Sequence, residues 1–284
     1  MKPPAFNYVA PTTLEEALDA RAEHADDCAV LAGGQSLMPL LNLRMAFPGT
    51  VIDLAGVGEL AGIREWDGGV AIGAMTRQRT AEGDALIRER APLMTTALPN
   101  IGHAAIRNRG TVGGSIAHAD PAAELPAVAL ALDAQLVAKK KRGERTIEAA
   151  DFFAGFLTTA LEPDELLVEV RVPGMAKGHG VAFHELARRH GDFALVGVAA
   201  AVALEGDKIA DCRLAFIGVG GTPMRAREAE KMLVGAQPSA EVFAEAAERA
   251  KAELDPAGDT HASAEYRRRV AGVLAQRALA EATR

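Results

Sequence analysis

The alternation of apolar and polar positions predicts a small α/β unit in the first 55 residues. Residues 14–22 have helical spacing, with Thr12 or Thr13 as N-cap and two glutamates in the first turn. A short apolar run before Gly33 predicts a buried strand that ends abruptly at two glycines. Ser36 can then cap a second helix, which would carry the apolar residues Leu37, Leu40, Leu41 and Met45.

Strands and helices alternate over residues 56–173, and the pattern changes after the predicted domain boundary. Asp120 can cap a helix with Pro121 at its first position. The segment ends in a strictly alternating, half-buried strand over 168–172. The Pro/Gly-rich stretch 173–180 is the best linker in the chain.

The residues after the linker predict an antiparallel hairpin followed by helices. Apolar runs at 196–204 and 209–219 flank the turn Gly206–Asp207. Three helices are then expected, two of them starting at serine N-caps; they lie near 224–234, 239–254 and 263–282. With 284 residues in all, the chain is long enough for two modest domains.

Composition excludes several classes of protein. The formal net charge of -7 argues against a nucleic-acid partner or an anionic membrane surface. The sequence contains no run of about 18 apolar residues, so it predicts no membrane span. No signal segment precedes the first helix, and we therefore expect a cytoplasmic protein. Cys28 and Cys212 are the two cysteines, too few for an all-cysteine iron–sulfur cluster.

Two glycine-rich segments carry the candidate chemistry. Ala32-Gly33-Gly34-Gln35-Ser36 and Thr111-Val112-Gly113-Gly114-Ser115 each pair adjacent glycines with a hydroxyl residue. Paired glycines let the backbone approach a ligand closely and aim successive N–H groups at it. Both segments therefore predict a phosphate or pyrophosphate site, although each could also be an ordinary turn.

Other motifs are weaker alternatives. The run Gly56-Val57-Gly58-Glu59-Leu60-Ala61-Gly62 follows a strand, but its third glycine is one residue late for a nicotinamide-binding fingerprint. The residues His118, Asp120 and Glu124 could suggest a metal site, but capping explains Asp120 without a metal. We expect no metal site and no nucleophile in this chain.

Three ordered motifs together resemble the FAD-binding medium subunit of molybdenum hydroxylases, the family of carbon monoxide dehydrogenase and quinoline 2-oxidoreductase. They are Ala32 to Leu37, Arg107 to Ser115, and Arg188 followed by Gly191-Asp192-Phe193-Ala194. The resemblance covers nearly the whole chain. It implies an α+β fold with two domains. The first, over 1–175, would be an FAD-binding domain of the vanillyl-alcohol-oxidase (PCMH) type with two subdomains divided near residue 55. The second, over 180–284, would be a C-terminal α+β domain with an antiparallel sheet, like that of the carbon monoxide dehydrogenase flavoprotein.

The resemblance also implies which residues contact FAD. Both glycine segments would wrap the diphosphate, while an apolar contact at Ile101, an acidic contact at Glu124 and the strand residue Leu167 would lie near the flavin. Phe193 stands where relatives have a tyrosine against the isoalloxazine, and His184 aligns with a basic position near it. The complete set expected at the cofactor is Ala32, Gly33, Gly34, Gln35, Ser36, Leu37, Ile101, Thr111, Gly113, Gly114, Ser115, His118, Asp120, Glu124, Leu167, His184 and Phe193.

The function implied by the resemblance is electron relay, with no catalytic side chain in this subunit. A large molybdenum-cofactor subunit would oxidise the substrate, and a small subunit with [2Fe–2S] clusters would pass the electrons on. FAD in this chain would deliver them to an external acceptor, and the whole would form a dimer of heterotrimers. The alternatives are a self-contained flavin oxidase of the same fold and a flavin-free assembly module.

Overall fold

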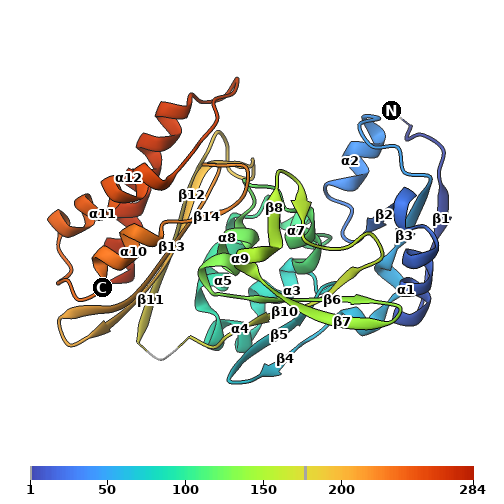
Figure 1. The fold of residues 1–284 in the computed structure, drawn as a ribbon, viewed down its shortest axis with the longest axis horizontal. Coiled ribbons are helices and arrows are strands. Elements are labelled where there is room, and N and C mark those ends of the chain that lie inside the picture. Colours follow the sequence, from blue (N-terminus) through green and yellow to red (C-terminus); the bar gives the residue numbers. More distant parts are fainter. Residues whose placement is uncertain (1, 176–177) are drawn as a thin grey trace.

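The computed structural model describes residues 2–175 and 178–284 and has three parts arranged in a row (Figure 1). A small N-terminal unit lies at one end, a central unit follows, and the C-terminal sheet with its helices lies at the other end. The predicted linker over 173–180 falls partly on residues 176–177, which lie outside the described residues. The α+β fold class expected from the sequence is confirmed.

The N-terminal unit is a three-stranded parallel sheet in the order β1-β3-β2. Its first helix is capped as predicted, because the Thr13 side chain accepts from the Glu16 N–H and Glu16 reaches back to the cap backbone. Its elements are β1 (Asn7–Val9), α1 (Leu14–Glu23), η1 (Ala25–Asp27), β2 (Cys28–Leu31), α2 (Leu37–Asn42) and β3 (Thr50–Asp53).

The predicted second helix forms with Ser36 at its N-cap position, but it differs from the prediction in two details. Ser36 occupies the N-cap position of α2, but its side chain makes no capping hydrogen bond, since its own backbone is already helical. The helix also ends at Asn42, where the chain turns through Arg44 with a φ of 56°. Met45 therefore lies beyond the helix and is exposed.

The central unit is a five-stranded antiparallel sheet in the order β4-β5-β10-β6-β7, with helices packed on it. Helix α8 is buried along its whole length, which agrees with the apolar sequence that follows Glu124. The elements are η2 (Leu54–Gly56), η3 (Gly58–Leu60), β4 (Ile63–Trp66), β5 (Gly69–Gly73), α3 (Gln78–Gly83), α4 (Ala85–Arg90), α5 (Pro92–Ala97), η4 (Leu98–Asn100), α6 (Ala104–Arg107), α7 (Val112–His118), α8 (Glu124–Ala131), β6 (Gln135–Lys140), β7 (Gly143–Glu148), α9 (Ala149–Phe152), β8 (Phe153–Gly155), β9 (Thr158–Thr159) and β10 (Leu166–Val172).

The predicted capping role of Asp120 is wrong. Helix α8 begins at Glu124 with Ala123 as N-cap. Asp120 instead closes the turn before the helix: its Oδ1 accepts from the Ala122 N–H at 2.8 Å, and its carbonyl accepts from the Ala123 N–H at 3.0 Å. An aspartate that bonds to its own backbone two residues on favours such a turn over a helix start.

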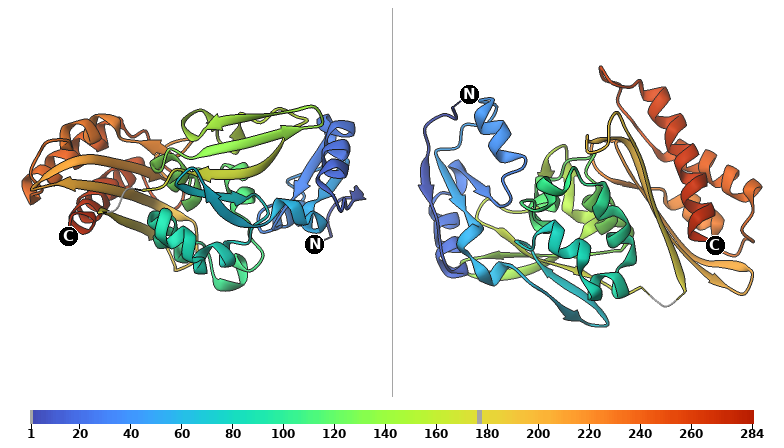
Figure 2. Two further views of the ribbon diagram at one scale, coloured as in Figure 1. Left: turned by 90° about the horizontal axis from the view of Figure 1, so that it is seen from below. Right: turned by 180° about the vertical axis from the view of Figure 1, so that it is seen from behind.

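The C-terminal part is a four-stranded antiparallel sheet with helices on one face (Figure 2). The hairpin of β12 and β13 and the serine N-caps of α11 and α12 were predicted. The other face of the sheet joins the central core, so β12 is buried on both sides and reads as a continuous apolar run. The elements are β11 (His179–Ala187), β12 (Ala194–Glu205), β13 (Lys208–Ile217), β14 (Met224–Arg225), α10 (Arg227–Leu233), α11 (Ala240–Glu253) and α12 (Ala264–Ala282).

Candidate functional site: a cavity between the three parts

A cavity of about 520 Å³ lies where the three parts of the chain meet. This is the size of a site that takes a small molecule or cofactor. Every residue expected at the cofactor except His184 borders it, namely Ala32, Gly33, Gly34, Gln35, Ser36, Leu37, Ile101, Thr111, Gly113, Gly114, Ser115, His118, Asp120, Glu124, Leu167 and Phe193. Segments far apart in the sequence are thus brought to one place.

The first glycine segment presents unused hydrogen-bond donors at this cavity. It leaves the end of β2 and turns at Gly34, whose φ of 75° favours glycine. No hydrogen bond within the described part of the chain uses the amide N–H groups of residues 33–36. Four successive donors without partners fit an anionic ligand such as a diphosphate.

The second glycine segment is built differently from the sequence prediction. Gly113 and Gly114 lie in the first turn of α7, which Thr111 caps by accepting from the Gly114 N–H at 3.1 Å. The Gly113 N–H donates to the Ala74 carbonyl at 2.9 Å, so it is not free for a ligand. Packing requires glycine at position 113, because a Cβ on this residue would lie 2.4 Å from the Cβ of Ala74. Of the two glycine segments, then, the first supplies the free amide donors.

The two segments are packed directly against each other at Gly33. A Cβ built on this residue would lie 2.5 Å from the carbonyl oxygen of Arg109 and 2.7 Å from the Cα of Gly110. Backbone atoms cannot yield to such an intrusion as a flexible side chain can. Gly33 is therefore the contact that sets the spacing between the two sides of the cavity.

Two buried polar residues support this arrangement and were given no role by the sequence. Gln78 borders the cavity, is 4% exposed, and leaves its Oε1 atom without a hydrogen-bond partner. Arg107 pairs with Glu82 at 2.9 Å and donates to the carbonyls of Ile101 and Gly102, so it holds the turn that forms one wall. Arg107 belongs to a motif that the sequence displays, whereas Gln78 has no local signal at all.

Apolar side chains line another portion of the cavity. Ile101 and Leu167 are almost fully buried in its wall, whereas Phe193 lies at the rim and is 60% exposed. A partly exposed phenyl ring beside a buried apolar wall fits a flat aromatic ligand group, which would cover it.

Two carboxyl groups meet near the boundary of the cavity with the C-terminal sheet. Burial of Glu124, reinforced by the nearby charge of Asp120, raises the pKa of its carboxyl to about 7. Burial of Glu185, together with the charge of Glu124, raises the pKa of Glu185 to about 8. The Oε2 atom of Glu185 is also buried without a hydrogen-bond partner.

Glu185, rather than His184, faces the central unit. Neighbouring residues of a strand point to opposite faces, and Phe183 of β11 belongs to the core shared with the central unit, whereas Ala182 belongs to the core under the helices. His184 lies on the helix side, with its Nε2 3.0 Å from a carboxylate oxygen of Glu281. The structure therefore does not bring His184 to the cavity, because the alternation along β11 turns its side chain to the helix side. The sequence analysis predicted no strand over 181–187, so this direction could not be foreseen.

We expect Glu185→Gln to stabilise the chain at alkaline pH. The folded-state pKa of Glu185 is above its unfolded value, so its contribution to stability is full below about pH 4.5 and is lost as the pH rises toward 8. The free energy of unfolding, measured by urea titration, should be unchanged at pH 4.5 and higher in the variant by about 2 kcal/mol at pH 8.5, a value reduced for partial exposure. Glu144→Gln, on an exposed hairpin, is the control, and equal pH profiles for wild type and Glu185→Gln would contradict the prediction.

Comparison with known proteins defines the class of protein that this cavity belongs to. Residues 4–175 match the family described as the FAD binding domain in molybdopterin dehydrogenase, and residues 181–282 match the CO dehydrogenase flavoprotein C-terminal domain. The chain belongs to this family of FAD-binding medium subunits of molybdenum-containing dehydrogenases, as its motifs predicted.

Individual relatives are similar over nearly their whole lengths. The chain is 44% identical to the 6-hydroxypseudooxynicotine dehydrogenase complex subunit alpha of Paenarthrobacter nicotinovorans, over 99% of this chain and 96% of that protein. A solved structure of carbon monoxide dehydrogenase from Hydrogenophaga pseudoflava superposes with a TM-score of 0.97 at 39% identity, covering 99% and 98% of the two chains. Quinoline 2-oxidoreductase from Pseudomonas putida 86 gives 0.95 at 37% identity, covering 100% and 98%.

Two further findings concern a metal and a membrane. Within 2–175 and 178–284, no group of three or more His, Cys, Asp or Glu side chains is arranged to hold a metal ion. None of the described helices combines the length and the apolar character that a bilayer span requires.

Proposed function

We propose that this chain binds FAD along the cavity, with the diphosphate on the first glycine segment. The observation that carries the proposal is the row of four unbonded amide N–H groups at residues 33–36, beside the helix that starts at Leu37. Thr111, Gly113, Gly114 and Ser115 would form the opposite side of the diphosphate site. The spacing that Gly33 sets between the two glycine segments fits an elongated ligand. The Oε1 atom of Gln78, which has no hydrogen-bond partner, fits a ligand with polar groups.

The isoalloxazine would occupy the apolar portion of the cavity. Ile101 and Leu167 would contact it from the buried wall, and Phe193 would cover it from the rim. Glu124, His118 and Asp120 would supply polar contacts at the same end. We further propose that residues 1–175 form the FAD domain and residues 180–284 the C-terminal domain.

The bound FAD would relay electrons within a larger assembly. FAD can accept and release electrons singly or in pairs, and the residues named above orient it and shield it from water. We propose a molybdenum-cofactor subunit and a [2Fe–2S] subunit as partners in a dimer of heterotrimers, with an external molecule as final acceptor. Relatives named as complex subunits or medium chains support this proposal, and the two cysteines of this chain leave any cluster to a partner. A cytoplasmic location stays a prediction from the sequence.

An absorption spectrum of the purified chain, alone and co-purified with its partner subunits, tests the proposal. Flavin bands near one per chain, joined by iron–sulfur absorbance only in the complex, are the expected result. Absence of flavin from both preparations would contradict FAD binding and favour an assembly module. Substrate oxidation by the chain alone would contradict the relay and favour a self-contained flavin oxidase.

A further inference from the structure

The segment 188–193 joins the C-terminal sheet to the cavity. It connects the end of β11 at Ala187 to the start of β12 at Ala194. Its last three residues, Gly191, Asp192 and Phe193, all border the cavity. The position of this connection therefore decides how that side of the cavity is closed.

A pair of stacked histidines ties this connection to the central unit. The rings of His103 and His190 lie with their centroids 5.8 Å apart and their planes 13° from parallel. His103 directly follows Ile101 and Gly102, which also border the cavity. Among the hydrogen bonds, ion pairs and ring contacts of the described residues, this stack is the one that joins 188–193 to the central unit.

Gly191 allows this close approach. Its φ of 89° is in the left-handed region, and a Cβ at this residue would lie 2.7 Å from the His103 Cε1 atom. The imidazole of His103 thus occupies the space that a side chain at Gly191 would need. The same ring contacts His190 by stacking and Gly191 by packing, so it holds two successive residues of the connection.

We propose that His103 and His190 form a clasp between the central unit and the C-terminal domain, which positions Gly191 to Phe193 against the bound cofactor. The part of this inference that concerns the cofactor rests on the proposed function. Both histidines are exposed side chains, so their replacement leaves the core intact. They are positioning residues, which act through Phe193 and the backbone beside it.

The expected effects follow from the strength of a ring pair. Such pairs are worth enough to change an equilibrium roughly two- to tenfold. His190→Ala should weaken FAD binding by about that factor and speed tryptic cleavage after Arg188 and Arg189 by a similar factor. His190→Phe keeps a stacking ring and should resemble wild type in both measurements. The double variant His103→Ala, His190→Ala should be no worse than His103→Ala alone, because the loss of the His103 ring already removes the stack.

Two separate measurements test the proposal. Limited trypsin digestion of the flavin-free chain tests the clasp, and flavin fluorescence titration measures FAD binding. Gly191→Ala should accelerate cleavage, whereas Gly206→Ala, also at a left-handed glycine but with open space around it, should not. Unchanged cleavage in His190→Ala would overturn the clasp, even if FAD binds. Accelerated cleavage in a chain that binds no FAD would retain the clasp and overturn the proposed function instead.

Discussion

Replacing Gly33 with valine should weaken FAD binding by about 100-fold while leaving the chain folded. The new side chain would collide with the backbone at Arg109 and Gly110, which has no means of yielding, so the first glycine segment must move away. Losing two hydrogen bonds to the diphosphate, at about 1.5 kcal/mol each, gives a change of this size. Flavin fluorescence titration measures the affinity, and circular dichroism checks the fold.

Gly58→Ala is the matched control for this experiment. Gly58 lies in the sequence Gly56-Val57-Gly58, which looks like part of a dinucleotide fingerprint. The structure places it in the short helix η3, where an added Cβ would meet no atom within 4 Å. FAD binding by Gly58→Ala should equal that of wild type. Wild-type affinity in Gly33→Val would show that the segment does not hold the diphosphate, and loss of binding in Gly58→Ala would move the site to this second glycine sequence.

Local signals in the sequence predicted helices and the cavity segments well. The serines at 239 and 263 each precede an amphipathic run, and both accept a hydrogen bond from the N–H three residues on. The first glycine segment was predicted as a turn between a strand and a helix, which the structure confirms. In these cases a single short stretch of chain contains the whole physical reason for the structure.

The features that the sequence could not predict depend on tertiary contacts. Strand β11 has mixed polar and apolar residues although one of its faces meets helix α12 and the other meets the central unit, because most of its side chains are only partly buried. Without that strand, the direction of Glu185 cannot be known. Gln78 is likewise an ordinary polar residue in sequence, and it becomes a cavity residue only because the Arg107–Thr111 segment packs over it.

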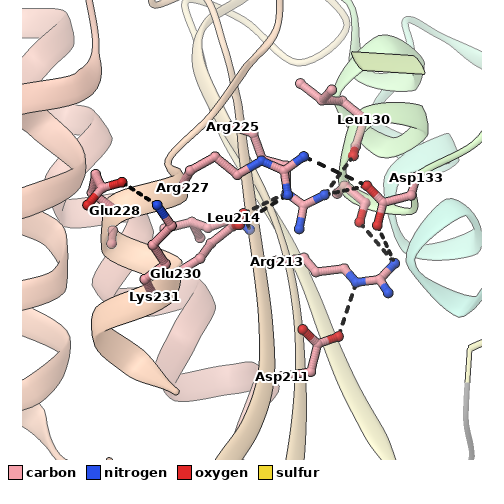
Figure 3. Close-up of polar contacts among 12 residues, drawn as sticks. Leu130, Asp133, Asp211, Arg213, Leu214, Arg225, Arg227, Glu228, Glu230 and Lys231 are labelled. Atoms are coloured by element: carbon pink, nitrogen blue, oxygen red, sulfur yellow. Dashed lines mark hydrogen bonds and ion pairs between the residues drawn. The ribbon is translucent and has the colours of Figure 1, made fainter. Parts of the chain in front are cut away.

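A second large effect is expected at the contact between the central unit and the C-terminal domain. Figure 3 shows Arg225 of β14 pointing between Glu230 and Asp133. The side chains of Arg225 and Glu230 are each 7% exposed, and their charged atoms lie 2.7 Å apart. Glu230 also accepts from the Leu214 N–H at 2.8 Å, so its carboxylate is fixed on the sheet. Arg225 reaches Asp133 in the turn after α8 at 2.5 Å.

Arg225→Ala should lower the free energy of unfolding by about 3–5 kcal/mol, because it leaves the buried carboxylate of Glu230 without its partner. Arg227→Ala is the matched control: its side chain is half exposed and its nearest carboxylate oxygens are 3.8 Å and 4.0 Å away, so a loss below about 1 kcal/mol is expected. Urea unfolding measures both variants.

The same substitution connects stability to the cofactor site. Helix α8 starts at Glu124 beside the cavity, and the turn after its last residue is held by Arg225 through Asp133. Freeing that turn should therefore loosen the wall of the cavity as well as the domain contact, and FAD affinity should fall together with stability. If Arg225→Ala unfolds more easily but binds FAD as tightly as wild type, α8 is held in place without Arg225, by its apolar packing and by Arg213, which lies 3.2 Å from Asp133. If the free energy of unfolding of Arg225→Ala falls by less than about 1 kcal/mol, water or another cation compensates the charge of Glu230. The ion pair would then not be what holds the two domains together.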